Sequence, residues 1–177
     1  ANRILTDAEA IPTSYEEIAN SIRAELEPAH GLLVTEDRTP AHAALAATVD
    51  DAEQLLPVLD ARVQHWREFV EARDHADSEL ENARQPLEEV LNKPLRPLAD
   101  AEKDLEDTKR AAGNLGPLKA AMSELQRLSE LLDPLESAYA DVRFFDVDVE
   151  QTEKQYEELP NDLQAEIEEE RLLNESA

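Results

Sequence analysis

Apolar residues recur along most of the chain in alternating steps of three and four. The clearest run consists of Leu45, Val49, Ala52, Leu56, Leu59, Val63, Trp66 and Val70. A second unbroken run consists of Leu118, Ala121, Leu125, Leu128, Leu132, Leu135, Tyr139 and Val142. This spacing is typical of the a and d positions of a heptad, which form one stripe along a helix that packs lengthwise against other helices.

Three further stripes have the same spacing. They are Tyr15, Ile18, Ile22, Leu26, Ala29 and Leu33; Leu98, Ala101, Leu105, Thr108 and Ala112; and Val149, Thr152, Tyr156, Leu159, Leu163 and Ile167. Together the five stripes predict helices over residues 13–35, 40–92, 95–112, 116–142 and 148–173.

Local signals place several of the helix ends. Thr39 before Pro40 fits an N-cap followed by the first helical position, and Asp148 with Gln151 three residues on fits a capping box. Gly113 and Asn114 indicate that one helix ends at residue 112, and Gly116 indicates that the next helix begins there.

The second predicted helix is too long for one compact globule. At 1.5 Å per residue it would span on the order of 80 Å, so we expect it to serve two successive bundles. Its apolar stripe lapses at Arg73 and Asp77 and resumes at Leu80 and Leu87. We place the junction between the two bundles at this lapse.

The chain also contains an internal repeat. At an offset of 106, Ile22, Leu26, Ala29 and Leu33 fall on Leu128, Leu132, Leu135 and Tyr139. At an offset of 104, Leu59, Ala61 and Val63 fall on Leu163, Ala165 and Ile167. Three helices of about 30 residues with their turns fill such a period, and successive repeats would share one continuous helix.

Composition supports helices and excludes several classes of function. The chain has 41% apolar residues, 4% aromatics and three glycines, which is unusual for a sheet protein. A net charge of −25 disfavours nucleic-acid binding and direct membrane binding, and is interpreted as a solvated surface or as a docking face for a basic partner. The chain has no cysteine and begins without methionine, so we expect a segment of a longer protein from a reducing compartment.

Several residues resemble those of a spectrin repeat. Trp66, Phe69 and Leu80 resemble the third helix of such a repeat as it leads into the next one. The Glu-Pro step at 27–28 and the Asp-Pro step at 133–134 are similar to its second helix. The resemblance implies an all-α fold of tandem three-helix bundles joined by a shared long helix in an elongated rod. Residues 1–76 would be an incomplete repeat with the second and third helices, and residues 77–177 a complete one.

The chain departs from the spectrin pattern in its first helix. The region near Leu98 lacks the usual tryptophan, and Ala76 stands where the family often has arginine. Prolines at 86, 94 and 97 predict a kink or break near 93–97, because proline removes a backbone hydrogen bond. How far this proline-rich junction near 86–97 flexes stays open. This divergence resembles the repeats of spectraplakin and nesprin linkers more than those of spectrin.

No catalytic, cofactor-binding or metal-binding residues are predicted. His30, His42, His65 and His75 lack zinc-site spacing, and His65 is expected at the edge of the core. Asp146, Asp148, Glu150 and Glu157 match a calcium loop, but Gln151 replaces the glycine of its sharp turn, so they are interpreted as helix-capping and solvated residues. Phe144 and Phe145 are expected to staple the last helix to the bundle, and Trp66 to lie in the core. The sequon at Asn174 is interpreted as chance.

We therefore expect a structural spacer and scaffold segment of a large cytoskeletal linker, and not an enzyme. The resemblance implies a cytoplasmic or cytoskeletal location, or the nuclear envelope, with actin, microtubules or intermediate filaments bound through the parent chain. Two alternatives stay open: an adaptor module whose groove accepts partner helices, and a dimeric coiled-coil tether.

Sedimentation velocity distinguishes the bundle from the dimeric tether. If the stripes pair within one polypeptide, the chain should sediment as a monomer over a wide range of concentrations. A two-chain species with the length of fully extended helices would contradict the intramolecular bundle.

Overall fold

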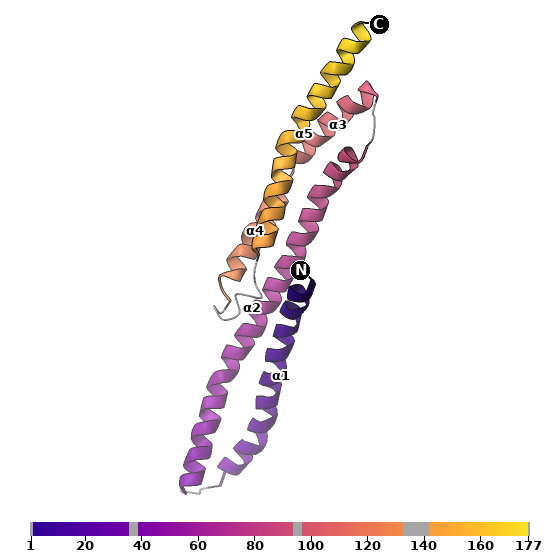
Figure 1. Cartoon of the computed structure of the whole chain (residues 1–177). Coiled ribbons are helices and arrows are strands. Elements are labelled where there is room, and N and C mark those ends of the chain that lie inside the picture. The colour runs from indigo at the N-terminus through magenta and orange to yellow at the C-terminus, as the bar shows by residue number, and fades with distance from the viewer. Residues whose placement is uncertain (1, 36–38, 94–96, 133–141, 177) are drawn as a thin grey trace. The chain divides into compact units, whose positions relative to one another are not determined.

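The computed structural model describes residues 2–35, 39–93, 97–132 and 142–176, with side chains of the first segment described from residue 10 onward. The regular structure of these residues is entirely helical, which confirms the all-α class. The helices are α1 (Asn2–Leu33), α2 (Pro40–Leu91), α3 (Leu98–Ala112), α4 (Gly116–Ser129) and α5 (Arg143–Glu175) (Figure 1).

The predicted ends of α2 and α3 agree closely with the structure. The helix α2 begins at Pro40, and the backbone N–H of His42 donates to Thr39 Oγ1 at 3.3 Å, so Thr39 is the expected N-cap. The helix α3 ends at Ala112, and the Gly113 N–H donates to the Lys109 carbonyl at 3.2 Å. Residues 94–96, where the kink was predicted, lie outside the described residues.

The prediction of a helix over 148–173 was wrong at its start. The helix α5 begins at Arg143 after Val142, which supplies no side-chain cap. Asp148 lies one turn inside α5, where its carboxylate pairs with Arg84 at 3.0 Å and its carbonyl accepts from Thr152 Oγ1 at 2.8 Å. The capping-box interpretation of Asp148 is therefore wrong, because Asp148 lies inside α5 and its carboxylate and carbonyl already have partners within the unit.

Two other helix predictions also need correction. The helix α4 ends at Ser129, not at 142, because the N–H groups of Leu131 and Leu132 bond the carbonyls three residues back and tighten the chain into a turn. The remainder of that predicted helix, including Leu135 and Tyr139, lies outside the described residues. At the other end of the chain α1 begins at Asn2, not at residue 13.

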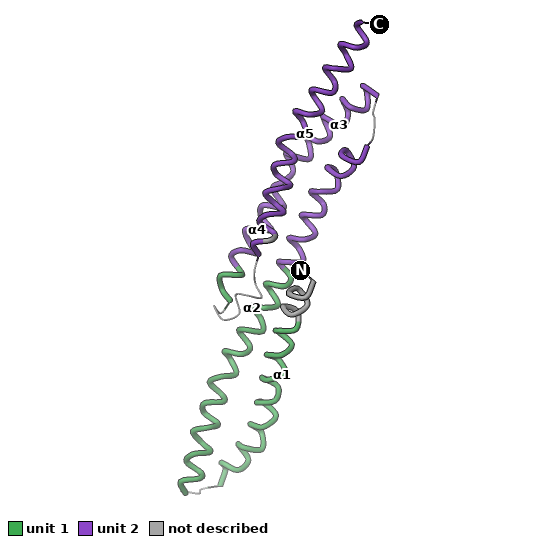
Figure 2. Tube along the Cα trace, in the orientation of Figure 1, with its two compact units in different colours: residues 1–71, 128–140 green, residues 72–127, 141–177 purple. Residues whose placement is uncertain are grey.

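The chain divides into two compact units (Figure 2). Unit 1 contains residues 1–71 and 128–140, and unit 2 contains residues 72–127 and 141–177. The boundary on α2 falls between Glu71 and Ala72, beside Arg73, where the apolar stripe lapses. The helix α2 crosses this boundary without interruption. The assignment of residues 1–76 and 77–177 to two spectrin-like repeats stays a prediction.

One buried cluster of unit 2 combines residues of three helices, and α4 adds further buried residues such as Leu118 and Leu125. The buried cluster contains Leu87 and Val90 of α2, Ala101 and Leu105 of α3, and Tyr156, Leu159, Leu163 and Ile167 of α5. All of these residues except Val90 lie at positions that the sequence analysis identified, so the heptad pattern correctly placed most of this cluster.

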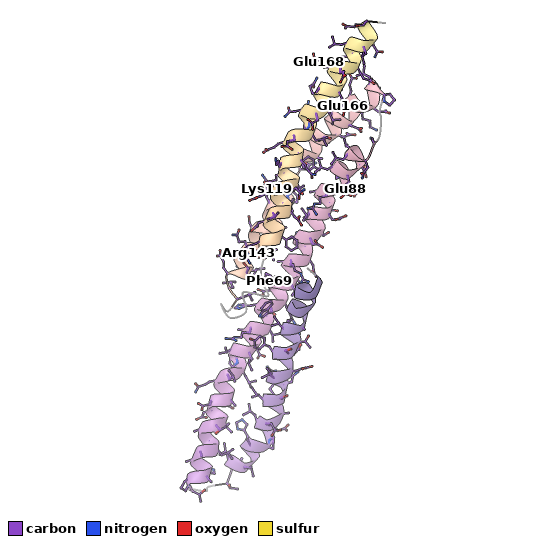
Figure 3. All side chains as sticks on the ribbon, in the orientation of Figure 1. Phe69, Glu88, Lys119, Arg143, Glu166 and Glu168 are labelled. Atoms are coloured by element: carbon purple, nitrogen blue, oxygen red, sulfur yellow. The ribbon has the colours of Figure 1, made fainter. Side chains whose placement is uncertain are left out.

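The helices α3 and α4 run antiparallel to α5 in nearly one register. Glu102 of α3 pairs with Arg171, and Lys119 of α4, labelled in Figure 3, pairs with Glu153 at 2.9 Å. From Glu102 to Lys119 the chain advances 17 positions, and the partners on α5 move back 18. The break at residues 113–115 therefore shifts the register by only about one position, and α3 and α4 act together as one bent partner of α5.

Truncation of a core leucine should destabilise unit 2 strongly. Leu163 is 1% exposed, so Leu163→Ala should lower the free energy of unfolding by about 2–5 kcal/mol through lost burial and a residual cavity. Leu172 on the same helix is 61% exposed, and Leu172→Ala should change it by less than about 0.5 kcal/mol. Urea denaturation followed by circular dichroism measures both, and equal effects would contradict this account of the core.

Candidate interaction surface

In unit 1, α1 and the first part of α2 form an antiparallel helical hairpin joined by a ladder of ion pairs. The pairs are Glu16–Arg67 at 2.6 Å, Arg23–Asp60 at 2.6 Å and His30–Glu53 at 3.0 Å. Each step of seven residues forward along α1 matches a step of seven backward along α2. The ladder therefore marks one edge of the hairpin at one pair per heptad.

The ladder sets register more than it supplies stability. The side chains of Arg23 and Asp60 are about half exposed, and such pairs contribute roughly 0.2–1 kcal/mol each. Buried side chains such as Ala19, Val63 and Trp66 stabilise the hairpin instead. Trp66 is fully buried, which confirms its predicted core position, and its ring meets Phe69 edge to face at 5.6 Å.

An apolar groove runs along a different side of the same hairpin. Successive residues of a helix turn by about 100°, so Ile22, one position before Arg23, points away from the ladder. The groove has a volume of about 430 Å³. Its lining consists of Ser21, Ile22, Glu25, Leu26 and Ala29 of α1 and Leu45, Thr48, Val49 and Ala52 of α2.

Exposed aliphatic residues extend the groove along both helices. Ile18 lies one turn before Ile22 and is 49% exposed, and Leu55 lies three residues after Ala52 and is 44% exposed. Small and aliphatic side chains thus form a continuous open surface on unit 1. Such a surface on a helical hairpin is suited to receive another helix.

Unit 2 contains a buried polar layer that ties α2 to α5. Arg84 pairs with Asp148 at 3.0 Å, and its Nε donates to Thr152 Oγ1 at 3.3 Å. Thr152 is fully buried and in turn donates to the Asp148 carbonyl. The buried hydroxyl of Thr152 therefore both donates and accepts a hydrogen bond, as burial requires, and the partly buried Arg84 and Asp148 pair with each other.

Tyr156 completes this connection one turn further along α5. Its hydroxyl donates to the Ala83 carbonyl at 2.6 Å. Pro86 has no backbone N–H, so within α2 the carbonyl four residues before it, at Asn82, loses its helical donor, and Ala83 is the next residue. The tyrosine hydroxyl thus bonds α2 one position from this gap, and burial raises the pKa of the Tyr156 hydroxyl.

The histidines occupy four separate environments. His30 belongs to the ladder, and His65 is partly buried at the edge of the core, as expected. His75 is exposed, and Nε2 of the partly buried His42 has no hydrogen-bond partner among the described residues. In the part of the chain that the structure describes, no cluster of histidines and carboxylates could hold a metal ion.

The acidic cluster considered as a calcium loop lies on a continuous helix. Asp146, Glu150 and Glu157 lie on one face of α5, but they are spread along about three turns of the helix, and Asp148 lies on the opposite face, so the four carboxylates do not converge on one ion. Phe145 is buried, but it lies in the first turn of α5 and not ahead of its cap. The side chain of Phe144 is outside the described residues. Asn174 of the sequon lies in the last turn of α5.

Two of these features were not anticipated from the stripes. The ladder could have been found by pairing charged residues of one predicted helix with oppositely charged residues of its neighbour, and by asking whether such pairs recur every seven residues. The polar layer was missed because Thr152 occupies an apolar stripe position, and its contact with Arg84 of another helix depends on packing that the stripe does not reveal.

A bundle core, a helix common to two units and heptad-spaced pairing define a helical repeat protein. A family model described as the spectrin-like repeat of nuclear anchorage protein 1 matches residues 54–168. The chain is also 45% identical over 172 residues to nuclear anchorage protein 1 of Caenorhabditis elegans, an alignment that covers 97% of the chain. The chain belongs to this family of spectrin-like repeats, which confirms the resemblance inferred from the sequence.

The chain spans only 2% of the length of that relative. No solved structure is similar enough to the chain to count as a match.

Replacement of Tyr156 should reveal its contact with α2 through the pH dependence of stability. At pH 7, Tyr156→Phe should lower the free energy of unfolding by about 0.5–1.5 kcal/mol, because the hydrogen bond from the tyrosine hydroxyl to the Ala83 carbonyl is lost. The raised pKa of Tyr156 stabilises the fold fully below the ordinary value of about 10, and this contribution is lost as pH rises through the folded value. The difference between wild type and variant should therefore shrink above pH 10 in urea titrations. A difference that stays constant to pH 11 would contradict the assignment.

Proposed function

We propose that the chain is a structural spacer and scaffold segment of a large linker that anchors the nucleus to the cytoskeleton. Two facts support this proposal: the chain belongs to a spectrin-like repeat family, and its relative is named as a nuclear anchorage protein. The segment has a mechanical role and no catalytic one. Its location is the cytoplasm, at the cytoskeleton or the nuclear envelope.

The continuity of α2 is the observation that carries this proposal. The 52-residue helix supplies residues 40–71 to unit 1 and residues 72–91 to unit 2 with no intervening loop. Phe69 and Ala76, on either side of the boundary, are both buried. A pulling force on one unit therefore reaches the next through helical backbone, which is stiffer than a flexible linker.

The surface charge favours protein partners. With a net charge of −25 the chain repels phosphate backbones and anionic lipids. Actin, microtubule or intermediate-filament systems would be reached mainly through other parts of the longer protein. Among the described residues, no helix is both long and apolar enough to span a bilayer.

Of the alternatives, the adaptor module is favoured by the apolar groove of unit 1. The dimeric tether is less well supported, because stripe residues such as Trp66 and Leu163 are already buried within a single chain. The groove and the spacer role are compatible, since a spacer can also present a docking surface.

Force measurements on the whole chain test the spacer role. In optical tweezers the wild-type chain should unfold both units in one event, because loss of α2 from one core removes it from the other. The variant Glu71→Gly/His75→Gly places two glycines on the exposed side of α2 at the boundary, each costing about 1 kcal/mol of helix stability. We expect this variant to unfold in two separate events.

A matched control separates uncoupling from simple weakening of the helix. The variant Asp50→Gly/Gln54→Gly makes the same change at exposed positions of α2 inside unit 1. It should unfold at lower force but still in one event. Two independent events in the wild-type chain would overturn the role of α2 as a shared mechanical element.

A further inference from the structure

Every helical path of unit 2 is interrupted near the middle of the unit. In α2, Pro86 has no backbone N–H, so the Asn82 carbonyl lacks its helical donor. In α5, Pro160 leaves the carbonyl of Tyr156 without its helical donor in the same way. Between α3 and α4 the helical path stops at residues 113–115 (Figure 1). Each path therefore has one turn in which the backbone hydrogen bonding is weakened.

A cavity brings these interruptions together. It has a volume of about 250 Å³. Its lining includes Asn82 and Pro86 of α2, Asn114 and Leu115 between α3 and α4, and Tyr156 of α5. The two residues whose carbonyls lack a helical donor thus lie at the same cavity as the break between α3 and α4. Because side chains around a cavity lose packing contacts, the bundle is held less firmly at this level.

The cavity also lies between two groups of buried apolar residues. One group is the cluster of α2, α3 and α5 residues described above, which includes Leu105 and Leu163. Leu118 and Leu125 of α4 are buried but lie outside this cluster. The cavity is lined by Tyr156 of the first group and by Leu118 of the second. A bend at the cavity can therefore leave the packing of both groups in place.

We propose that this level is a hinge built into unit 2, at which the bundle bends and opens locally while the apolar groups on both sides stay packed. A proline in one helix would not create such a hinge, because uninterrupted neighbours would keep that helix aligned. Interruptions of every path at one cavity remove this restraint. The inference concerns unit 2 alone and does not rest on the spacer role.

Two polar contacts beside the cavity hold the hinge closed. The Tyr156 hydroxyl donates to the Ala83 carbonyl at 2.6 Å, and Arg84 pairs with Asp148 at 3.0 Å. Both contacts join α2 to α5 next to the interrupted turn of α2. The closed form therefore dominates in the unloaded chain, and the hinge opens transiently.

Amide hydrogen exchange, followed by NMR on the whole chain, measures this opening. The informative amides flank the break: Asn114 donates to the Ala111 carbonyl at 2.9 Å, and Lys119 donates to the Leu115 carbonyl at 3.1 Å. We expect both amides to exchange at least about tenfold faster than the amide of Leu163, which is buried in the cluster.

A double variant shows whether the interruptions act together. Pro86→Ala/Pro160→Ala restores an N–H in α2 and in α5 and leaves α3 and α4 unchanged. If the bundle opens as one hinge, exchange of the Asn114 and Lys119 amides should slow at least about tenfold, although neither residue lies on a substituted helix. If the break only frays by itself, the double variant leaves both rates unchanged, and the proposal is overturned.

A matched control restores a helical N–H away from the cavity. Pro57 lies on the exposed side of α2 in unit 1, so Pro57→Ala should leave exchange of the Asn114 and Lys119 amides unchanged. Equal slowing by this variant would overturn the hinge, because the effect would not depend on the cavity. Wild-type rates as slow as that of Leu163 would also overturn it. The force measurements test continuity of α2, so they decide the spacer role separately from the hinge.

Discussion

Burial of the two apolar stretches of α2, one on each side of the lapse at Arg73, is the constraint on which both units depend. The same helix supplies Val63 and Trp66 to the interior of unit 1 and Leu87 and Val90 to the core of unit 2. Neither unit could bury its remaining stripes without its share of α2. The glycine-poor, alanine- and leucine-rich composition serves this demand, because a helix of this length must form without interruption.

Polar contacts determine how the helices are aligned on this apolar base. In unit 1 the ion pairs are about half exposed and contribute little to stability. Their role is to favour one alignment of the two helices over others in which the apolar stripes would also match. In unit 2 the alignment is set at the partly buried ion pair of Arg84 with Asp148, where Arg84 also donates to the buried hydroxyl of Thr152. The two units thus use different chemistry for the same purpose.

The heptad pattern was sufficient to predict the helix class, most of the core residues and the length of α2, because burial of a stripe leaves a strong periodic signal; the stripe residue Ile18 is an exception and is 49% exposed. Helix ends were harder to predict where no side-chain cap exists: α5 starts after Val142 with no capping oxygen, so Asp148 was taken as the cap. The end of α4 at Ser129 depends on backbone turns that the leucine spacing does not reveal. The groove could not be predicted at all, because a stripe shows which residues are apolar and not whether a partner covers them.

The order of charges along the hairpin ladder has a consequence for proteins built of many similar helices. If α1 slid by one heptad along α2 in one direction, Glu16 would face Asp60. In the other direction, Arg23 would face Arg67. In the first case Arg23 would meet Glu53 instead, but either displacement replaces an attractive pair by like charges, although the apolar stripes would keep their spacing. The order of charges therefore favours the native register over a slip of one heptad when neighbouring segments fold together or re-form after being stretched.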